Sequence, residues 1–319
     1  MSDVTVVETR RVVVGPGVEV EVRVQRPGSG PAAGAADPAD PQRSRVVGVV
    51  EDAASLPVLA VHGLASNARM WDGVAARLAE AGHTVAAVDQ RGHGRSDKPE
   101  GGYDFATLTG DLLAVLDDLG WDDPARPPVV AGQSWGGNVA VELAARHPAR
   151  VGGLVLVDGG TIELSGRFAD WPTCEAALAP PAFEGVPYDE LSARMRRMHA
   201  DWPPEGIEGQ LANLERLPDG TARPWLSRAN HLRILRHLWD HHPSSRWPLL
   251  QMPVLVVAAG TPDGGRADAA KREEVDRAVR ALPAARAVWV DGDHDLHAQH
   301  PDRIASLITT VAAGGTLEA

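Results

Sequence analysis

The chain has 319 residues, of which 44% are hydrophobic, so it is long enough for one sizeable α/β domain with an insertion. Its 31 lysines and arginines against 43 aspartates and glutamates give a formal net charge of -12, which argues against nucleic acid or an anionic membrane as a partner and favours a small neutral or apolar molecule. The single cysteine, Cys174, excludes an intrachain disulfide.

The amino-terminal segment carries charges and two valine-rich runs. Residues 1–10 lack a long apolar run, and no later stretch approaches the roughly 18 apolar residues that span a bilayer, so we expect a soluble cytoplasmic protein. Residues 5–14 and 18–25 flank Gly15-Pro16-Gly17, a pattern that predicts a β-hairpin. Residues 27–44 are rich in glycine, proline, alanine and aspartate, and predict an extended or mobile loop because they have little apolar surface to bury.

From residue 57 onward, short continuous apolar runs alternate with helical segments. Runs that are apolar at every position belong to strands covered on both faces, and helices between them make the crossovers of a parallel sheet. The pattern predicts an α/β fold with a mostly parallel, doubly wound sheet. Its strands are expected in residues 57–61, 84–88, 128–131, 153–157, 253–259 and 287–290.

The alternation stops between Asp158 and Pro253, where helical patterns predominate. We expect helices over residues 191–199, 209–217 and 228–239, separated by Trp202-Pro203-Pro204 and Pro224. This segment is predicted to form a helical lid, which carries five of the nine tryptophans: Trp171, Trp202, Trp225, Trp239 and Trp247. The expected domains are therefore a core of residues 1–158, a lid of residues 159–250 and a second core part of residues 251–319.

The most informative stretch is Gly132-Gln133-Ser134-Trp135-Gly136. It follows the apolar run 128–131 and precedes a helical pattern over residues 138–147. A serine on so sharp a strand-to-helix turn adopts a strained backbone that exposes its hydroxyl, and flanking glycines let the two elements approach. Ser134 is therefore the candidate nucleophile.

A serine hydroxyl needs a base to remove its proton, and the base needs a carboxylate to hold it in the right tautomer. His294 lies just beyond the last apolar run and before Pro301, the expected first residue of a closing helix over residues 302–311. It is the candidate base, with His297 and His300 as nearby competitors. Two carboxylates follow strands, Asp263 and Asp158. We favour Asp263, because the expected order is serine, acid, histidine with the acid in the loop after the penultimate strand, and keep Asp158 as the alternative.

Acyl transfer also needs N–H groups that stabilise the oxyanion. The backbone N–H groups of Leu64, in His62-Gly63-Leu64, and of Trp135 are the expected pair. His93 lies between Gly92 and Gly94 in the loop 89–96, where we expect it to support the loop rather than to act as a base.

Taken together in this order, these segments resemble the α/β-hydrolase superfamily, especially its lid-bearing esterase, epoxide-hydrolase-like and haloperoxidase-like members. The resemblance implies a triad of Ser134, Asp263 and His294, with Leu64 and Trp135 at the oxyanion hole. The chain departs from the family twice. Epoxide hydrolases and haloalkane dehalogenases carry aspartate where this chain has Ser134, and many relatives have glycine where it has Asp293, a carboxylate expected to raise the pKa of the His294 imidazole. The matching segments are 61–64, 89–96, 132–137, 260–263 and 293–294 with Pro301.

The resulting hypothesis is a serine hydrolase that needs no cofactor and cleaves a small, partly apolar carboxylic ester, lactone or related acyl compound. The sequence leaves its oligomeric state open. One alternative is a small-molecule-binding protein on the same fold, without catalysis. Another is a metal hydrolase, which would leave the serine without a role. Its ligands would come from His294, His297 and His300 among Asp291, Asp293 and Asp295.

Overall fold

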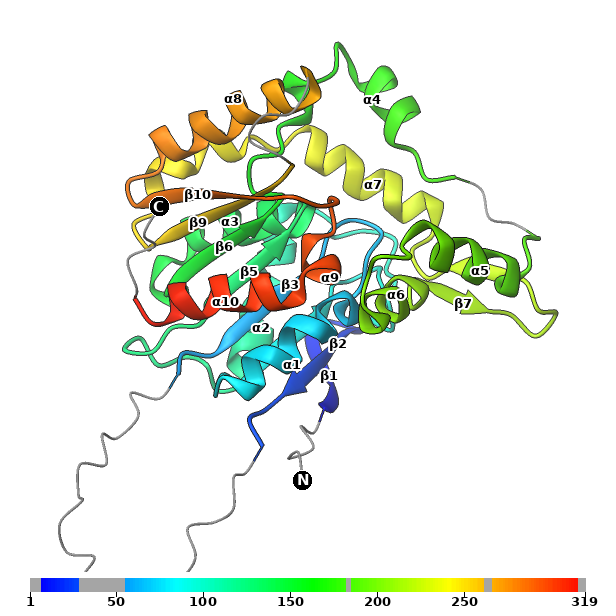
Figure 1. The fold of residues 1–319 in the computed structure, drawn as a ribbon, viewed down its shortest axis with the longest axis horizontal. Coiled ribbons are helices and arrows are strands. Elements are labelled where there is room, and N and C mark those ends of the chain that lie inside the picture. Colours follow the sequence, from blue (N-terminus) through cyan, green and yellow to red (C-terminus); the bar gives the residue numbers. More distant parts are fainter. Residues whose placement is uncertain (1–6, 29–54, 182–184, 261–265, 315–319) are drawn as a thin grey trace, which may run out of the picture.

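The computed structural model describes residues 7–28, 55–181, 185–260 and 266–314. Its centre is an eight-stranded sheet with the strand order β1-β2-β4-β3-β5-β6-β9-β10 (Figure 1). The predicted hairpin and all six predicted core strands are present, while most of the predicted loop 27–44 lies outside the described residues. The strands are β1 (Val7–Gly15), β2 (Val18–Gln25), β3 (Val58–Val61), β4 (Val85–Asp89), β5 (Val129–Gln133), β6 (Gly153–Val157), β9 (Val254–Ala259) and β10 (Ala285–Val290).

The sheet is parallel from β4 through β10, and only the hairpin β1–β2 runs antiparallel to its neighbours. Every residue of β3, β4, β5, β6 and β9 is buried, which explains their continuous apolar runs, because helices cover both faces. One face packs on α1 and α10, and the other on α2, α3 and α8. These helices are α1 (Asp72–Glu80), α2 (Phe105–Asp118), α3 (Trp135–Arg146), α8 (Arg266–Ala281) and α10 (Pro301–Ala312), which begins at the predicted proline.

The segment between β6 and β9 holds four helices and a small hairpin. The predicted helix over residues 228–239 is confirmed as α7, and the one over 191–199 begins three residues earlier as α5. Short 3-10 turns complete the segment and the core: η1 (Ala68–Trp71), η2 (Pro148–Arg150), η3 (Leu164–Gly166), η4 (Pro243–Ser245) and η5 (Trp247–Leu249). The larger elements are α4 (Trp171–Leu178), α5 (Tyr188–Met198), α6 (Pro204–Leu211), β7 (Leu214–Arg216), β8 (Ala222–Pro224) and α7 (Arg228–Trp239).

The predicted helix over residues 209–217 is wrong. Helix α6 begins at Pro204, which suits a first helical position, and ends at Leu211. The chain then forms the antiparallel pair β7–β8 around a turn in which Gly220 has φ +85°. The Asp219 carboxylate accepts hydrogen bonds from the backbone N–H and the hydroxyl of Thr221, so local turn chemistry overrides the helical pattern.

Candidate active site

The turn between β5 and α3 places Ser134 in a strained conformation. Its backbone has φ 52° and ψ -124°, a left-handed region that residues other than glycine rarely adopt. The flanking glycines are required by close packing: a Cβ on Gly132 would lie 2.5 Å from the Gly136 carbonyl oxygen, and one on Gly136 would lie 2.4 Å from the His62 carbonyl oxygen. The sequence therefore folds locally as predicted, into a turn that presents the serine at the carboxyl edge of the sheet.

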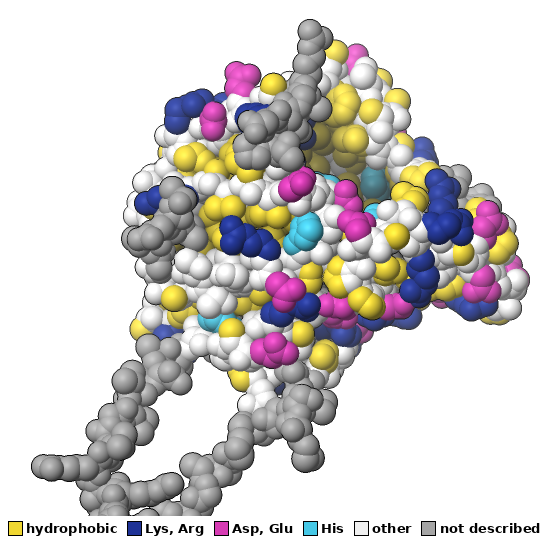
Figure 2. All heavy atoms as spheres, in the orientation of Figure 1, with side chains coloured by type: hydrophobic (Ala, Val, Ile, Leu, Met, Phe, Trp, Pro, Cys, Tyr) yellow, Lys and Arg dark blue, Asp and Glu magenta, His cyan; other side chains and the backbone are white. Residues whose placement is uncertain are grey.

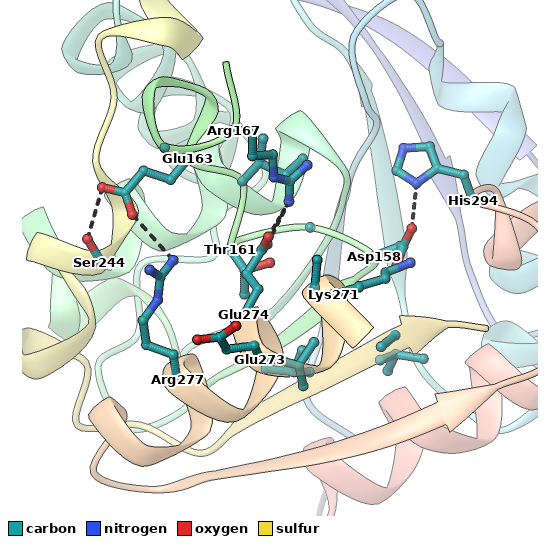
Figure 3. Close-up of a pocket in the computed structure, with 18 of the residues that line it drawn as sticks. Asp158, Thr161, Glu163, Arg167, Ser244, Lys271, Glu273, Glu274, Arg277 and His294 are labelled. Atoms are coloured by element: carbon teal, nitrogen blue, oxygen red, sulfur yellow. Dashed lines mark hydrogen bonds and ion pairs between the residues drawn. The ribbon is translucent and has the colours of Figure 1, made fainter. Parts of the chain in front are cut away.

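Among the described residues, the carboxylate that contacts His294 is that of Asp158. The imidazole Nδ1 donates to Asp158 Oδ2 over 2.6 Å, and Figure 3 shows the two side chains facing one another. Asp158 directly follows β6, the neighbour of β5 in the sheet, and its φ is 46°. Asp263, the carboxylate favoured by chain order, lies outside the described residues, and the alternative named from the sequence occupies the position beside the imidazole.

Burial and charge act in opposite directions on this pair. Burial of Asp158, whose side chain is 5% exposed, raises its pKa, but the hydrogen bond from His294 and the charge of Lys271 outweigh burial and lower it. For His294, desolvation lowers the pKa, and the hydrogen bond and negative charge of Asp158 more than compensate and raise it above its ordinary value. The pair thus consists of an ionised carboxylate and a histidine of increased basicity.

Backbone contacts bring Ser134 and this pair to the same place. The Ser134 N–H donates to the Val157 carbonyl oxygen over 3.0 Å, next to Asp158 in the chain. Gln133, the residue before Ser134 in the chain, donates from its side-chain amide to the His294 carbonyl oxygen over 3.2 Å. The three sequence-predicted positions 134, 158 and 294 therefore lie in one cluster at the carboxyl ends of β5 and β6.

The backbone at the end of β3 runs against this cluster. A Cβ on Gly63 would lie 3.1 Å from the Ser134 Cβ, so the backbone directly before Leu64 passes close to the serine. Trp135 is the first residue of α3, and the N–H groups of a first helical turn have no partner within the helix. Both predicted oxyanion donors are thus carried by backbone that borders Ser134.

Two buried histidines hold this backbone. His62 donates from Nδ1 to the Gly63 carbonyl oxygen over 2.7 Å, and its Nε2 accepts from the Gln90 N–H over 3.1 Å. His93 accepts from the Ala65 N–H at Nε2 over 3.3 Å, and its ring stacks on that of Trp135. His93 therefore supports the loop, as the sequence predicts, and both of its ring nitrogens are occupied by backbone groups.

The other histidines near His294 do not form a ligand set. His297 is fully buried against Trp71, and desolvation lowers its pKa to about 3. Within the described ranges, no group of three or more histidine, cysteine, aspartate or glutamate side chains is arranged to hold a metal ion. The metal-hydrolase alternative therefore finds no support in the geometry of the described residues.

Two contacts at the site carry no sequence signal. Lys271, in α8, lies with Nζ 2.5 Å from Asp158 Oδ1, although it is more than a hundred residues from that aspartate in the chain. The Trp202 indole N–H donates to the Asp293 carboxylate over 3.1 Å and so joins the segment between β6 and β9 to the loop of His294. Among the carboxylates, Asp158 and then Asp295 raise the pKa of His294.

A cavity of about 990 Å³ opens beside the Asp158–His294 pair. Figure 3 shows the two side chains at one end and the charged pairs Arg167–Glu274 and Arg277–Glu163 at the other. Figure 2 shows a hollow walled by hydrophobic side chains on one face of the molecule, with histidine visible at its depth. The cavity therefore gives a small molecule room beside the Asp158–His294 pair, between charged and apolar residues, whereas Ser134 is not among the residues that line it.

This sheet topology, with a strained serine between a central strand and a helix and a histidine–aspartate pair beside it, defines an α/β hydrolase. A family model, the alpha/beta hydrolase family, matches residues 58–307. The chain belongs to this family, which confirms the resemblance drawn from the sequence. No helix within the described ranges has the length and apolarity to cross a membrane.

Several known proteins are similar to the chain. It is 38% identical over 112 residues to a protein of Mycobacterium phage D29 named putative non-heme haloperoxidase, which covers 35% of the chain and 39% of that protein. It is 40% identical over 111 residues to Epoxide hydrolase A of Mycobacterium tuberculosis, covering 34% and 33% of the two chains. The aligned part is thus less than two thirds of either relative. The crystal structure of E-2-(acetamidomethylene)succinate hydrolase superposes with a TM-score of 0.68 at 24% identity, covering 97% of this chain and 100% of that one, and so shares its fold.

Proposed function

We propose that the protein is a serine hydrolase that cleaves a small, partly apolar carboxylic ester, lactone or related acyl compound. One observation carries the proposal: Ser134 occupies a strained turn next to a hydrogen-bonded histidine–aspartate pair. Strain at a buried turn is maintained by the surrounding structure and is typical of functional positions. A protein that only binds a ligand has no need of this combination.

In the proposed reaction, the Ser134 hydroxyl attacks the substrate carbonyl while the His294 Nε2 accepts its proton. Asp158 accepts from Nδ1, fixes the tautomer in which Nε2 can act as a base, and stabilises the imidazolium that forms. The N–H groups of Leu64 and Trp135 stabilise the oxyanion. His294 then protonates the leaving oxygen, and water attacks the acyl-enzyme to release the acid and restore Ser134. No step needs a cofactor or metal.

The residue at position 134 separates this reaction from that of the named epoxide hydrolase relative. Opening of an epoxide by this superfamily proceeds through an aspartate ester, whereas Ser134 forms an acyl ester from a carbonyl compound. The net charge of -12, and apolar residues such as Ile162 and Val275 in the lining of the cavity, favour a neutral substrate with an apolar part over a polyanion. Location in the cytoplasm remains a prediction from the sequence.

The test compares hydrolysis of short p-nitrophenyl esters by the protein and by Ser134→Ala. We expect kcat/KM to fall by about 10⁴-fold or more, because removal of the nucleophile leaves only oxyanion and binding contributions. A fluorophosphonate probe should label the parent protein and not the variant. Full turnover by the variant would exclude Ser134 as nucleophile, and a folded parent protein that neither turns over esters nor reacts with the probe would identify a binding protein instead.

A further inference from the structure

The carboxylate of Asp158 is held on both oxygens by groups from different parts of the fold. Oδ2 accepts from His294, while Oδ1 accepts from the Ala259 N–H over 3.0 Å and lies 2.5 Å from Lys271 Nζ. The same ammonium donates to the Ala259 carbonyl oxygen over 2.8 Å. Lys271 therefore ties α8 to the end of β9 and to the carboxylate that faces the imidazole.

The choice of lysine here is notable for this chain. Lys271 is one of two lysines among its 31 lysines and arginines, the other being Lys98. A compact ammonium fits between two oxygens that approach from different directions, whereas the planar guanidinium suits two oxygens side by side. The Lys271 side chain is 30% exposed and that of Asp158 is 5% exposed, so the ion pair is shielded from solvent on the aspartate side.

We propose that Lys271 is a positioning residue of the catalytic pair: it fixes the side chain of Asp158 and sets the pH range in which His294 accepts a proton. The inference rests on the proposed function and adds a residue to it. Lys271 and His294 share one carboxylate from opposite oxygens, so the ammonium draws negative charge away from the imidazole. Without the ammonium, the negative charge of Asp158 would act on His294 with no positive charge to offset it.

The charged surroundings of His294 determine the direction of the effect. Burial lowers the pKa of His294, the hydrogen bond and charge of Asp158 and the charge of Asp295 raise it, and the charge of Lys271 lowers it. Asp293 and His199, from the loop of His294 and the lid, act in turn on Asp295. Because Lys271 is the cation among these groups that opposes Asp158, its removal should raise the pKa of His294. The protein would then lose activity at a higher pH as the solution is acidified.

The experiment measures kcat/KM against pH for Lys271→Met, Lys271→Gln and Lys271→Arg. The methionine removes both charge and donor, the glutamine keeps a donor without charge, and the arginine keeps the charge. We expect the acidic limb to move upward by about 0.5 to 1 pH unit in the methionine and glutamine variants. The arginine variant should stay within about 0.2 unit of the parent protein.

Arg280→Met is the matched control, since it removes the same charge from the same helix. Arg280 lies nine residues further along α8, which is about 13 Å along the helix axis. At this distance, salt at physiological concentration largely screens the interaction between exposed charges. Its acidic limb should coincide with that of the parent protein. A purely structural role of Lys271 would lower kcat/KM at all pH values without moving the limb.

An NMR titration of the His294 ring in the same variants provides a readout that does not depend on turnover. A rise in the His294 midpoint in Lys271→Met and Lys271→Gln, reversed in Lys271→Arg, supports the inference. An unchanged midpoint in both neutral variants overturns it, even if Ser134→Ala abolishes ester hydrolysis. If instead Ser134→Ala retains full turnover, the proposed function fails, while the titration still shows whether Lys271 controls His294.

Discussion

Replacing Asp158 by asparagine should inactivate the protein through the orientation of the new amide. In the parent structure, Oδ1 faces two donors, the Ala259 N–H and the Lys271 ammonium. An asparagine at this position must therefore place its carbonyl oxygen there, which leaves its NH₂ group facing His294 Nδ1. Two donors cannot face one another, so Nδ1 must lose its proton and Nε2 must carry it. The imidazole is then in the tautomer that cannot accept the proton of Ser134.

The size of the loss follows from this tautomer. An asparagine in place of the triad aspartate of a serine protease lowers kcat by about 10⁴ for the same reason. A loss of 10³ to 10⁴ in kcat corresponds to about 4 to 5.5 kcal/mol of transition-state stabilisation. The 2.6 Å hydrogen bond and the 5% exposure of Asp158 place this chain in the same regime, since water cannot easily replace the carboxylate.

The assay is ester hydrolysis by Asp158→Asn beside the matched variant Asp263→Asn. We expect the first to lose at least 10³ in kcat and the second to stay within about threefold of the parent protein. Thermal unfolding and circular dichroism must show that both variants are folded, because Asp158→Asn also leaves Lys271 without its counter-ion. An Asp158→Asn variant with more than a tenth of the parent kcat, together with an inactive Asp263→Asn, would refute the assignment and make Asp263 the acid.

Three further substitutions test the surroundings of the site. Gly159→Ala places a Cβ 2.2 Å from the Ser134 carbonyl oxygen, so urea unfolding should show a loss of at least about 2 kcal/mol and probe labelling should fall; parent-like stability would contradict the packing. Burial raises the pKa of Glu142, but hydrogen bonds from His241, Arg246 and Arg146 hold it at about 2, so stability is present above pH 4.5 and is lost as pH falls toward 2. Glu142→Gln should reduce the free energy of unfolding at pH 7 by up to about 3 kcal/mol, and should weaken the dependence of this free energy on pH between 4.5 and 2. An acid-unfolding transition at the same pH in both proteins would contradict this role of Glu142. His297→Leu removes two buried ring nitrogens that lack hydrogen-bond partners in the described structure. The variant should keep ester hydrolysis, and its free energy of unfolding should stay within about 1 kcal/mol of the parent protein. Complete inactivation would indicate that His297 binds a metal or takes part in the reaction.

The strands and the strained turn at Ser134 were predictable because their signals are local. A strand buried on both faces must be apolar at each position, and β3, β5 and β6 show this in runs of four or five residues. The turn at Ser134 needs glycine at two fixed positions, since any Cβ there would collide with backbone. Both requirements can be met only by particular residue types at particular spacings.

The carboxylate was not predictable with the same certainty, because its choice depends on lateral neighbours in the sheet. Chain order offered the ends of two strands, and only the parallel pairing of β6 with β5 places Asp158 next to Ser134. Lys271 reaches this aspartate across the crossover helix α8, a contact that no local pattern encodes. The error over residues 209–217 has a different origin, a turn centred on Asp219 and Gly220 that interrupts a helix-like pattern.

Since β5, α3 and β6 form one continuous strand–helix–strand unit, residues 129–158 contain both Ser134, the proposed nucleophile, and Asp158, the carboxylate that contacts His294. Two of the three groups of the proposed triad are thus carried by one unit, and only His294 comes from elsewhere in the chain. The segment between β6 and β9 lies outside this unit, so changes in its length and chemistry can alter what the protein accepts, whereas the crossover after β9 must keep Lys271 in reach of Asp158.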